Sequence, residues 1–208
     1  MTKLLSLVIV LLSVNFGLFV NQNNPNPEWN LSKSKDQISI YTRKVSYSNY
    51  KEFKGEVIVS AKPADVINLL KNIDEFKYWL PDCMESKKLK QISNAQQINY
   101  ILTEVPWSYE DRDIVYKFTI VGESLNSGEF RIFLENKPQY ISGEKDVVRI
   151  PKSKGSWIIT PLSDHKTKLV YQMHVEPGGY VPSWLANLKI TDTPYAFLYN
   201  LREQLKNN

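Results

Sequence analysis

Alternating apolar and polar residues dominate the chain from residue 38 onward. In residues 38–41 and 53–59 the apolar residues recur at every second position, which is the period of a strand with one buried face. The same pattern predicts further strands at residues 85–92, 97–104, 112–121, 129–135, 146–151, 155–161 and 167–176. Because short strands that follow one another directly pair antiparallel, this series predicts an antiparallel sheet.

Helical spacing of apolar residues occurs in three places. Residues 63–70 begin with Pro63, which suits a first helical turn, and a second short helical segment at residues 74–80 ends before Pro81. The longest helix is predicted at residues 183–206, with Pro194 expected to bend it. The apolar residues of that helix are Trp184, Leu185, Leu188, Tyr195, Leu198, Leu201 and Leu205.

This order of elements predicts an α+β fold in which a curved antiparallel sheet wraps around the last helix. Such a fold can leave an apolar cavity between the sheet and the helix, and the pattern alone leaves open whether side chains or a ligand fill it. Within residues 112–121 and 167–176, two stripes are candidates for the cavity wall. They consist of Arg112, Ile114, Tyr116, Phe118 and Ile120, and of Leu169, Tyr171, Met173 and Val175.

The first residues form a separate region. Lys3 is followed by an apolar stretch from residue 4 to residue 20 and then by a polar Asn- and Pro-rich segment, the order that is typical of an export signal. We therefore predict a signal peptide or an uncleaved membrane anchor at residues 1–20, a linker at residues 21–28 and one domain at residues 29–208. The protein is expected to be exported, either to a periplasm or out of the cell.

Composition narrows the function classes. The chain has 26 Lys and Arg against 22 Asp and Glu, and this small, dispersed excess favours anionic membrane surfaces but does not indicate a nucleic-acid partner. Cys83 is the single cysteine, and is expected to be a buried small side chain, with a nucleophile as the alternative. The oligomeric state is not indicated.

Catalytic and cofactor motifs are missing from the sequence. His165 and His174 have neither a cysteine nor a further histidine at ligand spacing, so no zinc site is predicted. The sequence also contains no Gly-x-Ser-x-Gly elbow, phosphate-binding glycine loop or dinucleotide fingerprint. We therefore predict no metal, no cofactor and no enzymatic activity.

Four stretches resemble one known family. They are residues 76–81 (Phe-Lys-Tyr-Trp-Leu-Pro), residues 106–115 (Pro-Trp-Ser-Tyr-Glu-Asp-Arg-Asp-Ile-Val), residues 155–157 (Gly-Ser-Trp) together with residues 167–171, and residues 176–185 (Glu-Pro-Gly-Gly-Tyr-Val-Pro-Ser-Trp-Leu). In this order, over about residues 29–205, they resemble the START (steroidogenic acute regulatory protein related lipid transfer) family.

The resemblance implies a helix-grip fold around an apolar tunnel, with the C-terminal helix and the loop between residues 121 and 129 acting as a lid. Family members bind sterols, phospholipids, sphingolipids or related molecules and move them between membranes without covalent chemistry. Phe118 stands where sterol-carrying members have a cavity arginine. The resemblance therefore predicts a lipid ligand without favouring a sterol. The expected partners are a lipid or other apolar molecule and, transiently, a membrane surface.

Twelve residues are the candidate ligand-binding set: Tyr100, Leu102, Glu104, Trp107, Arg112, Ile114, Tyr116, Phe118, Tyr171, Met173, Trp184 and Leu188. Buried tyrosines can offer a hydroxyl to a ligand head group. Glu104 is in phase with Tyr100 and Leu102, and if it faces the cavity Arg112 is its expected partner. Arg112 is otherwise expected in an ion pair with neighbouring carboxylates, and Trp184 is either a core anchor or a membrane-contacting residue.

Two alternatives remain open. One is an enzyme of the same fold, of the cyclase or hydrolase type, that uses Glu104 with Tyr100 or Tyr116 for acid–base chemistry. The other is an interaction module anchored through residues 4–20, whose cavity is filled by side chains. An apolar cavity of roughly 300–1,000 Å³ would favour the lipid-binding prediction over the second alternative.

Overall fold

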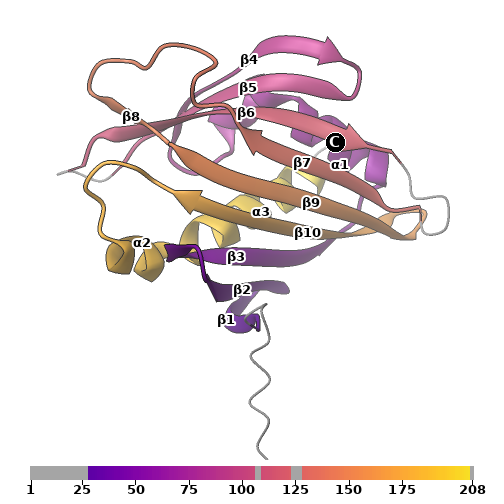
Figure 1. Ribbon diagram of the computed structural model, residues 1–208. Helices are drawn as coiled ribbons and strands as arrows, with labels where there is room; N and C mark the ends of the chain where they lie inside the picture. The colour runs from indigo at the N-terminus through magenta and orange to yellow at the C-terminus, as the bar shows by residue number, and fades with distance from the viewer. Residues whose placement is uncertain (1–27, 106–108, 123–127, 207–208) are drawn as a thin grey trace, which may run out of the picture.

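A curved ten-stranded sheet forms the body of the protein in the computed structural model, which describes residues 28–105, 109–122 and 128–206 (Figure 1). The strands are β1 (Asn30–Lys35), β2 (Ile38–Val45), β3 (Ser48–Val59), β4 (Cys83–Ser93), β5 (Gln96–Thr103), β6 (Asp111–Val121), β7 (Phe130–Asn136), β8 (Val147–Arg149), β9 (Lys152–Ser163) and β10 (Lys166–Glu176). They lie in the order β1-β2-β3-β10-β9-β7-β6-β5-β4, and every pair along this path is antiparallel. The short β8 pairs in parallel with β6.

The first strand was not predicted. β1 is polar and largely exposed and pairs with β2 at the edge of the sheet. A two-residue turn joins β1 and β2, in which Asp36 and Gln37 have positive φ angles of 50° and 58°. Two consecutive left-handed residues are the geometry that a tight hairpin requires, so the turn compensates for a strand with little apolar surface to bury.

The helices are α1 (Pro63–Lys71), the 3-10 helix η1 (Ile73–Tyr78), α2 (Ser183–Lys189) and α3 (Asp192–Lys206). The prediction of one bent C-terminal helix was wrong, because α2 and α3 are separate helices. Pro194 lies in the first turn of α3, where the missing N–H costs nothing. In a continuous helix, the backbone carbonyl of residue 190 would have no hydrogen-bond donor at residue 194, because proline lacks an N–H group.

α3 packs against the inner face of the sheet, by which we mean the face that the helix covers (Figure 1). Gly55 on β3 permits the close approach, since a Cβ atom at this position would lie 2.5 Å from Cδ1 of Leu198. Leu198 and Leu201 are fully buried in the main core, which fills the space between the sheet, α1 and α3. This arrangement confirms the predicted helix-grip fold.

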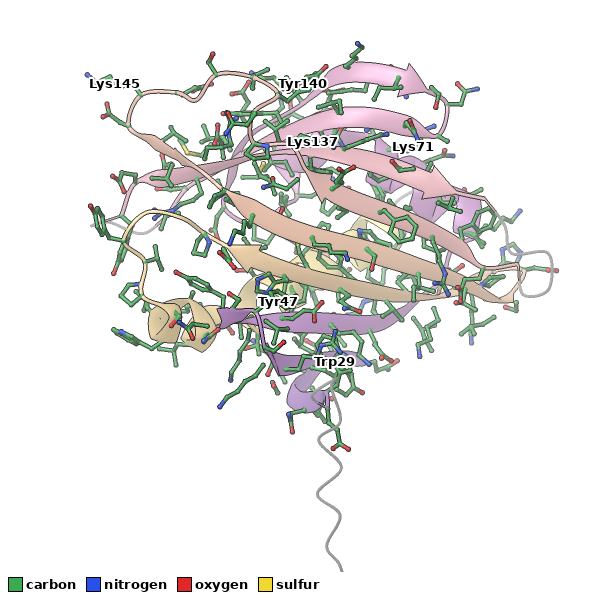
Figure 2. The ribbon with its side chains drawn as sticks, viewed as in Figure 1. Trp29, Tyr47, Lys71, Lys137, Tyr140 and Lys145 are labelled. Atoms are coloured by element: carbon green, nitrogen blue, oxygen red, sulfur yellow. The ribbon has the colours of Figure 1, made fainter. Side chains whose placement is uncertain are left out.

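The outer face of the sheet is also covered at one end. The connection between β7 and β8 crosses over β5 and β6, and Lys137, Tyr140 and Lys145 mark its course in Figure 2. Beneath it lies a second apolar cluster made of Ile98, Tyr100 and Val115, with Leu89, Leu102 and Ile141 packed against it. Both faces of β5 and β6 are therefore buried.

Several predictions fall on residues outside the described ranges. These are the signal peptide or anchor at residues 1–20, nearly all of the linker at residues 21–28, Trp107 and most of the proposed lid loop. Within the part of the chain that the structure describes, no helix is both long enough and apolar enough to span a membrane.

Candidate functional site

An apolar cavity of about 210 Å³ lies between the inner face of the sheet and α3. Its lining consists of Phe53, Leu70, Phe76, Leu80, Ile101, Ile114, Tyr116, Phe118, Leu134, Ser153, Trp157, Tyr171, Met173, Val175, Thr193, Pro194 and Phe197. Alternate residues of β6 and β10 contribute because every second side chain of a strand points to the same face.

A second hollow of about 240 Å³ adjoins this cavity beneath the junction of α2 and α3. The two share the lining residues Phe53, Met173, Val175, Thr193 and Pro194. The main cavity is smaller than the predicted lower bound of about 300 Å³. The second hollow is also below that bound, and the shared lining residues place the two hollows side by side from the core toward α2.

Stacked aromatic rings account for the small size of the main cavity. Trp157 and Tyr171 stack with their centroids 4.2 Å apart, and Phe197 of α3 meets both rings edge-on at 5.6 and 5.4 Å. On the other side, Phe197 stacks on Trp79 at 5.4 Å. These rings fix one wall of the cavity and join α3 to the sheet through aromatic contacts.

The polar groups of the cavity are uncharged. Burial raises the pKa of Tyr116 and of Tyr171 well above the ordinary value for a phenol, so both hydroxyls stay protonated at neutral pH. The Tyr171 hydroxyl donates a hydrogen bond to Sδ of Met173 at 2.9 Å, and Tyr116 lies against Asn99. The described lining can therefore offer hydroxyl groups to a ligand, but it contains no acidic or basic side chain.

Five of the twelve predicted residues line the main cavity: Ile114, Tyr116, Phe118, Tyr171 and Met173. Tyr100, Leu102 and Glu104 do not, and placing them on its wall was wrong. Tyr100 and Leu102 lie in the cluster on the outer face, and Glu104 is exposed beside a surface hollow. The three do share one face, as the phase of the strand predicts, but Ile101 is the residue of β5 that reaches the cavity.

The ion-pair prediction for Arg112 was also wrong. Neighbouring residues of a strand point to opposite faces, so Asp111 and Asp113 lie on the outer face while Arg112 points inward. Asp113 pairs with Arg149 instead, with Arg149 Nε to Oδ1 at 2.6 Å and Nη2 to Oδ2 at 2.8 Å. Arg112 does not line either hollow, but it lies directly beyond Ile114 on the same face of β6.

Two further predicted residues point to solvent. Trp184 and Leu188 lie one turn apart on α2 and are 68% and 67% exposed, so neither reaches the cavity. Trp184 is therefore not a core anchor. Trp107 lies outside the described residues.

The Cys83 thiol is the candidate nucleophile, and His, Cys, Asp and Glu side chains are the candidate metal ligands. Burial raises the pKa of the Cys83 thiol, which keeps it protonated, and Cys83 packs against the main core. No group of three His, Cys, Asp or Glu side chains with metal-binding geometry occurs in the described ranges.

Twelve of the seventeen lining residues were not in the candidate ligand-binding set, and four of these twelve are aromatic. Phe53, Phe76, Trp157 and Phe197 line the cavity. Phe197 is three residues after Pro194 and four before Leu201, so helical spacing was a signal that could have identified it. Phe53 likewise belongs to the alternating run of β3.

Comparison with known proteins agrees with this architecture. A crystal structure of a STAR-related lipid transfer protein from Xanthomonas axonopodis superposes with a TM-score of 0.79 at 38% identity, over 86% of this chain and 98% of that one. An uncharacterized protein of Pseudomonas aeruginosa is 34% identical over 193 residues, 93% of each chain. The human phosphatidylcholine transfer protein is 25% identical over 187 residues, 86% of this chain and 85% of that protein.

The START domain family matches residues 17–208, which include every described element of the sheet and the helices around the cavity. By this match and by its helix-grip fold, the chain belongs to the START domain family.

Proposed function

We propose that the protein binds a single lipid or other apolar molecule in the cavity, for lipid transfer or sensing, and catalyses no reaction. The observation that carries the proposal is the apolar lining of the main cavity, together with the largely apolar lining of the adjoining hollow, which also includes Lys51, Asn187 and Lys189. Burying hydrocarbon there is favourable by about 0.8 kcal/mol for each CH₂ group. The lipid-transfer relatives support the same function.

The composition of the lining also supports a binding role over acid–base catalysis. Among the described residues, no carboxylate, histidine or cysteine lines either hollow, and the hydroxyls of Tyr116 and Tyr171 are held in their neutral form. The enzyme alternative relies on Glu104, which is exposed on the surface. A proton donor or acceptor that titrates near neutral pH is therefore missing from the described cavity wall.

The proposal is tested by native mass spectrometry of the full-length protein purified from its own cells, followed by organic extraction. A lipid present at one molecule per chain is the expected result and identifies the ligand class. A protein that carries no lipid and takes none from phosphatidylcholine vesicles would overturn the proposal.

Narrowing the cavity should reduce lipid occupancy. Val175 lies where the two hollows meet, so Val175→Phe adds a ring to the shared wall, and we expect about a tenfold loss of bound lipid. Val170→Phe is the matched control, since it makes the same change on the opposite face of β10. Equal lipid occupancy in the two variants, measured by native mass spectrometry, would show that the ligand lies elsewhere.

We propose further that α2 and the loop before it make the transient contact with a membrane surface. Tyr180, Trp184 and Leu188 are 96%, 68% and 67% exposed, an unusual exposure for large apolar side chains in one short segment. α2 is held in place because Asn187 accepts a hydrogen bond from the backbone N–H of Lys51 at 2.8 Å and donates one to the carbonyl of Asn49 at 3.0 Å. The second hollow opens beneath this same helix.

Removing the two exposed side chains of α2 should weaken membrane binding. In the variant Trp184→Ala/Leu188→Ala we expect at least a tenfold loss of co-sedimentation with phosphatidylcholine–phosphatidylglycerol vesicles, because burying each such side chain is worth about 1.5–3 kcal/mol. The control is Ile58→Ala, an exposed apolar residue on the outer face of β3. If the control loses as much binding as the double variant, α2 is not the contact.

A further inference from the structure

Arg112 is a buried arginine that has no anionic partner within the part of the chain that the structure describes. Its side chain is only 4% exposed, and of its guanidinium nitrogens only Nη1 forms a hydrogen bond, to the carbonyl oxygen of Glu110. Nε and Nη2 are fully buried and have no hydrogen-bond partner among the described residues. A buried guanidinium with two free donors is costly, which indicates that a group outside the described chain satisfies them.

The two free nitrogens form one edge of the guanidinium. Nε and Nη2 present their N–H groups side by side, and this edge matches the two oxygens of a carboxylate or phosphate. The same molecule shows such a pairing, because Arg149 uses its Nε and Nη2 to hold both carboxylate oxygens of Asp113. In Arg112 the equivalent edge has no partner in the described ranges.

The position of Arg112 connects this edge to the cavity. Ile114, the next inward-facing residue of β6, lines the cavity, and residues two apart in a strand are separated by about 6.8 Å. The guanidinium lies under the loop that leads into α2, because a Cβ atom added to Gly179 would lie 3.1 Å from Nη2. Gly179 has a positive φ of 60° and Gly178 one of 72°, so this tight loop covers the guanidinium without a side chain.

The nearby carboxylates do not fill this role. Glu104, Glu110 and Asp111 line an open hollow on the surface, and no described carboxylate lies within salt-bridge distance of Arg112. Asp113 is on the other face of β6 and is engaged by Arg149. The guanidinium carbon lies 5.9 Å from the centroid of the Tyr109 ring and Nη1 donates to the carbonyl oxygen of Glu110, so its described neighbours include no carboxylate at the Nε–Nη2 edge.

We propose that the Nε–Nη2 edge of Arg112 binds the oxyanion of the lipid's head group, a carboxylate or a phosphate, and so selects acidic over neutral lipids. This inference rests on the proposed lipid binding and adds the chemistry of the ligand's polar end. The apolar chain would occupy the cavity beside Ile114, with the head group at the Arg112 end of β6.

The experiment compares ligands that share their chains and differ only in the oxyanion. Native mass spectrometry of the full-length protein is used with hexadecanoic acid against hexadecanol, and with dihexadecanoyl phosphatidic acid against dihexadecanoyl glycerol. Inorganic phosphate alone is the third arm, read by thermal unfolding. The proteins are the wild type, Arg112→Gln, Arg112→Lys and the control Arg131→Gln, which removes an exposed arginine from β7.

We expect the wild type and Arg131→Gln to prefer one or both acidic lipids at least tenfold. Arg112→Gln should lose that preference while it still binds the neutral lipids, and Arg112→Lys should keep only part of it, since an ammonium lacks the paired donors. The pair that shows the preference identifies the head group as carboxylate or phosphate. Retained binding of the neutral lipids also shows that Arg112→Gln is folded.

The failures of the two proposals differ. Equal binding of acidic and neutral lipids by the wild type, or an unchanged preference in Arg112→Gln, overturns the role of Arg112 and leaves lipid binding intact. Stabilisation by inorganic phosphate that depends on Arg112, without a lipid preference, also overturns the head-group assignment. If the wild type binds none of the four lipids, the proposed function itself fails.

Discussion

Replacing Asp113 by Ala is expected to lower the free energy of unfolding by about 3–5 kcal/mol. The Asp113 side chain is completely buried, and both of its carboxylate oxygens are held by Arg149. In the wild type, hydrogen bonds to that carboxylate are the largest cause of the raised pKa of Arg149. Without Asp113 the guanidinium, whose side chain is only 12% exposed, keeps its positive charge and loses this partner. Urea unfolding of the variant and the wild type measures the loss.

The loss of stability in Asp113→Ala should extend to the connection between β7 and β8, which covers the outer face of the sheet. Arg149 Nη1 also donates to the carbonyl oxygens of Pro138 and Ile141, at 2.8 and 3.1 Å. The ion pair therefore holds the connection between β7 and β8 in place over Tyr100. In Asp113→Ala we expect faster backbone amide hydrogen exchange in residues 137–146.

Two controls separate the ion pair from a general effect of removing charge. Glu135→Ala breaks an exposed pair with Lys137 and should change stability by less than about 1 kcal/mol. Asp113→Leu/Arg149→Met removes both charges of the pair and should recover much of the loss, because no unpaired charge remains. If Asp113→Ala were no less stable than Glu135→Ala, the buried pair would not hold this part of the fold together.

The sequence predicted the positions of the strands well because alternation reflects burial directly. It could not tell the two faces of β5 apart, since Ile98, Tyr100 and Leu102 are as apolar as a cavity wall although they lie under the connection between β7 and β8. Which face meets α3 depends on contacts between residues far apart in the chain. Glu104 was assigned to the wrong face for this reason.

Other errors have local causes. β1 carries too few apolar residues for its pattern to be recognised, and its pairing with β2 depends on backbone hydrogen bonds and the turn at Asp36 and Gln37. The ion pair expected for Arg112 came from closeness in the sequence, which in a strand places neighbours on opposite faces. Asp113 instead finds Arg149, 36 residues away along the chain.

The candidate site shows the same limit. Alternation on β6 and β10 identified Ile114, Tyr116, Phe118, Tyr171 and Met173 as one wall of the cavity. The opposite wall comes from α3, and the volume depends on how the rings of Trp157, Tyr171 and Phe197 stack. Stacking is a property of three elements in contact, so neither the pattern nor the family resemblance gives the size of the cavity.

The second large effect is expected from the indole at the centre of this stack. Trp157→Ala should lower the free energy of unfolding by about 3–5 kcal/mol, because Trp157 is nearly fully buried and its removal leaves a hole between β9 and α3. Urea unfolding measures the loss. The control is Phe133→Ala on the outer face of β7, whose half-exposed ring should cost far less.

The same variant should widen the ligand space, because Trp157 lines the cavity. We expect Trp157→Ala to bind bulkier apolar molecules than the wild type and to regain part of its lost stability when such a ligand is present, since a ligand that binds only the folded state stabilises it. Thermal unfolding with and without added lipid tests this, with the milder Trp157→Leu used if the alanine variant does not fold. If lipid stabilises the wild type but neither Trp157 variant, the expectation is wrong, because filling the cavity with hydrocarbon does not then determine binding. The stacked rings would instead contact the ligand directly and contribute to its recognition.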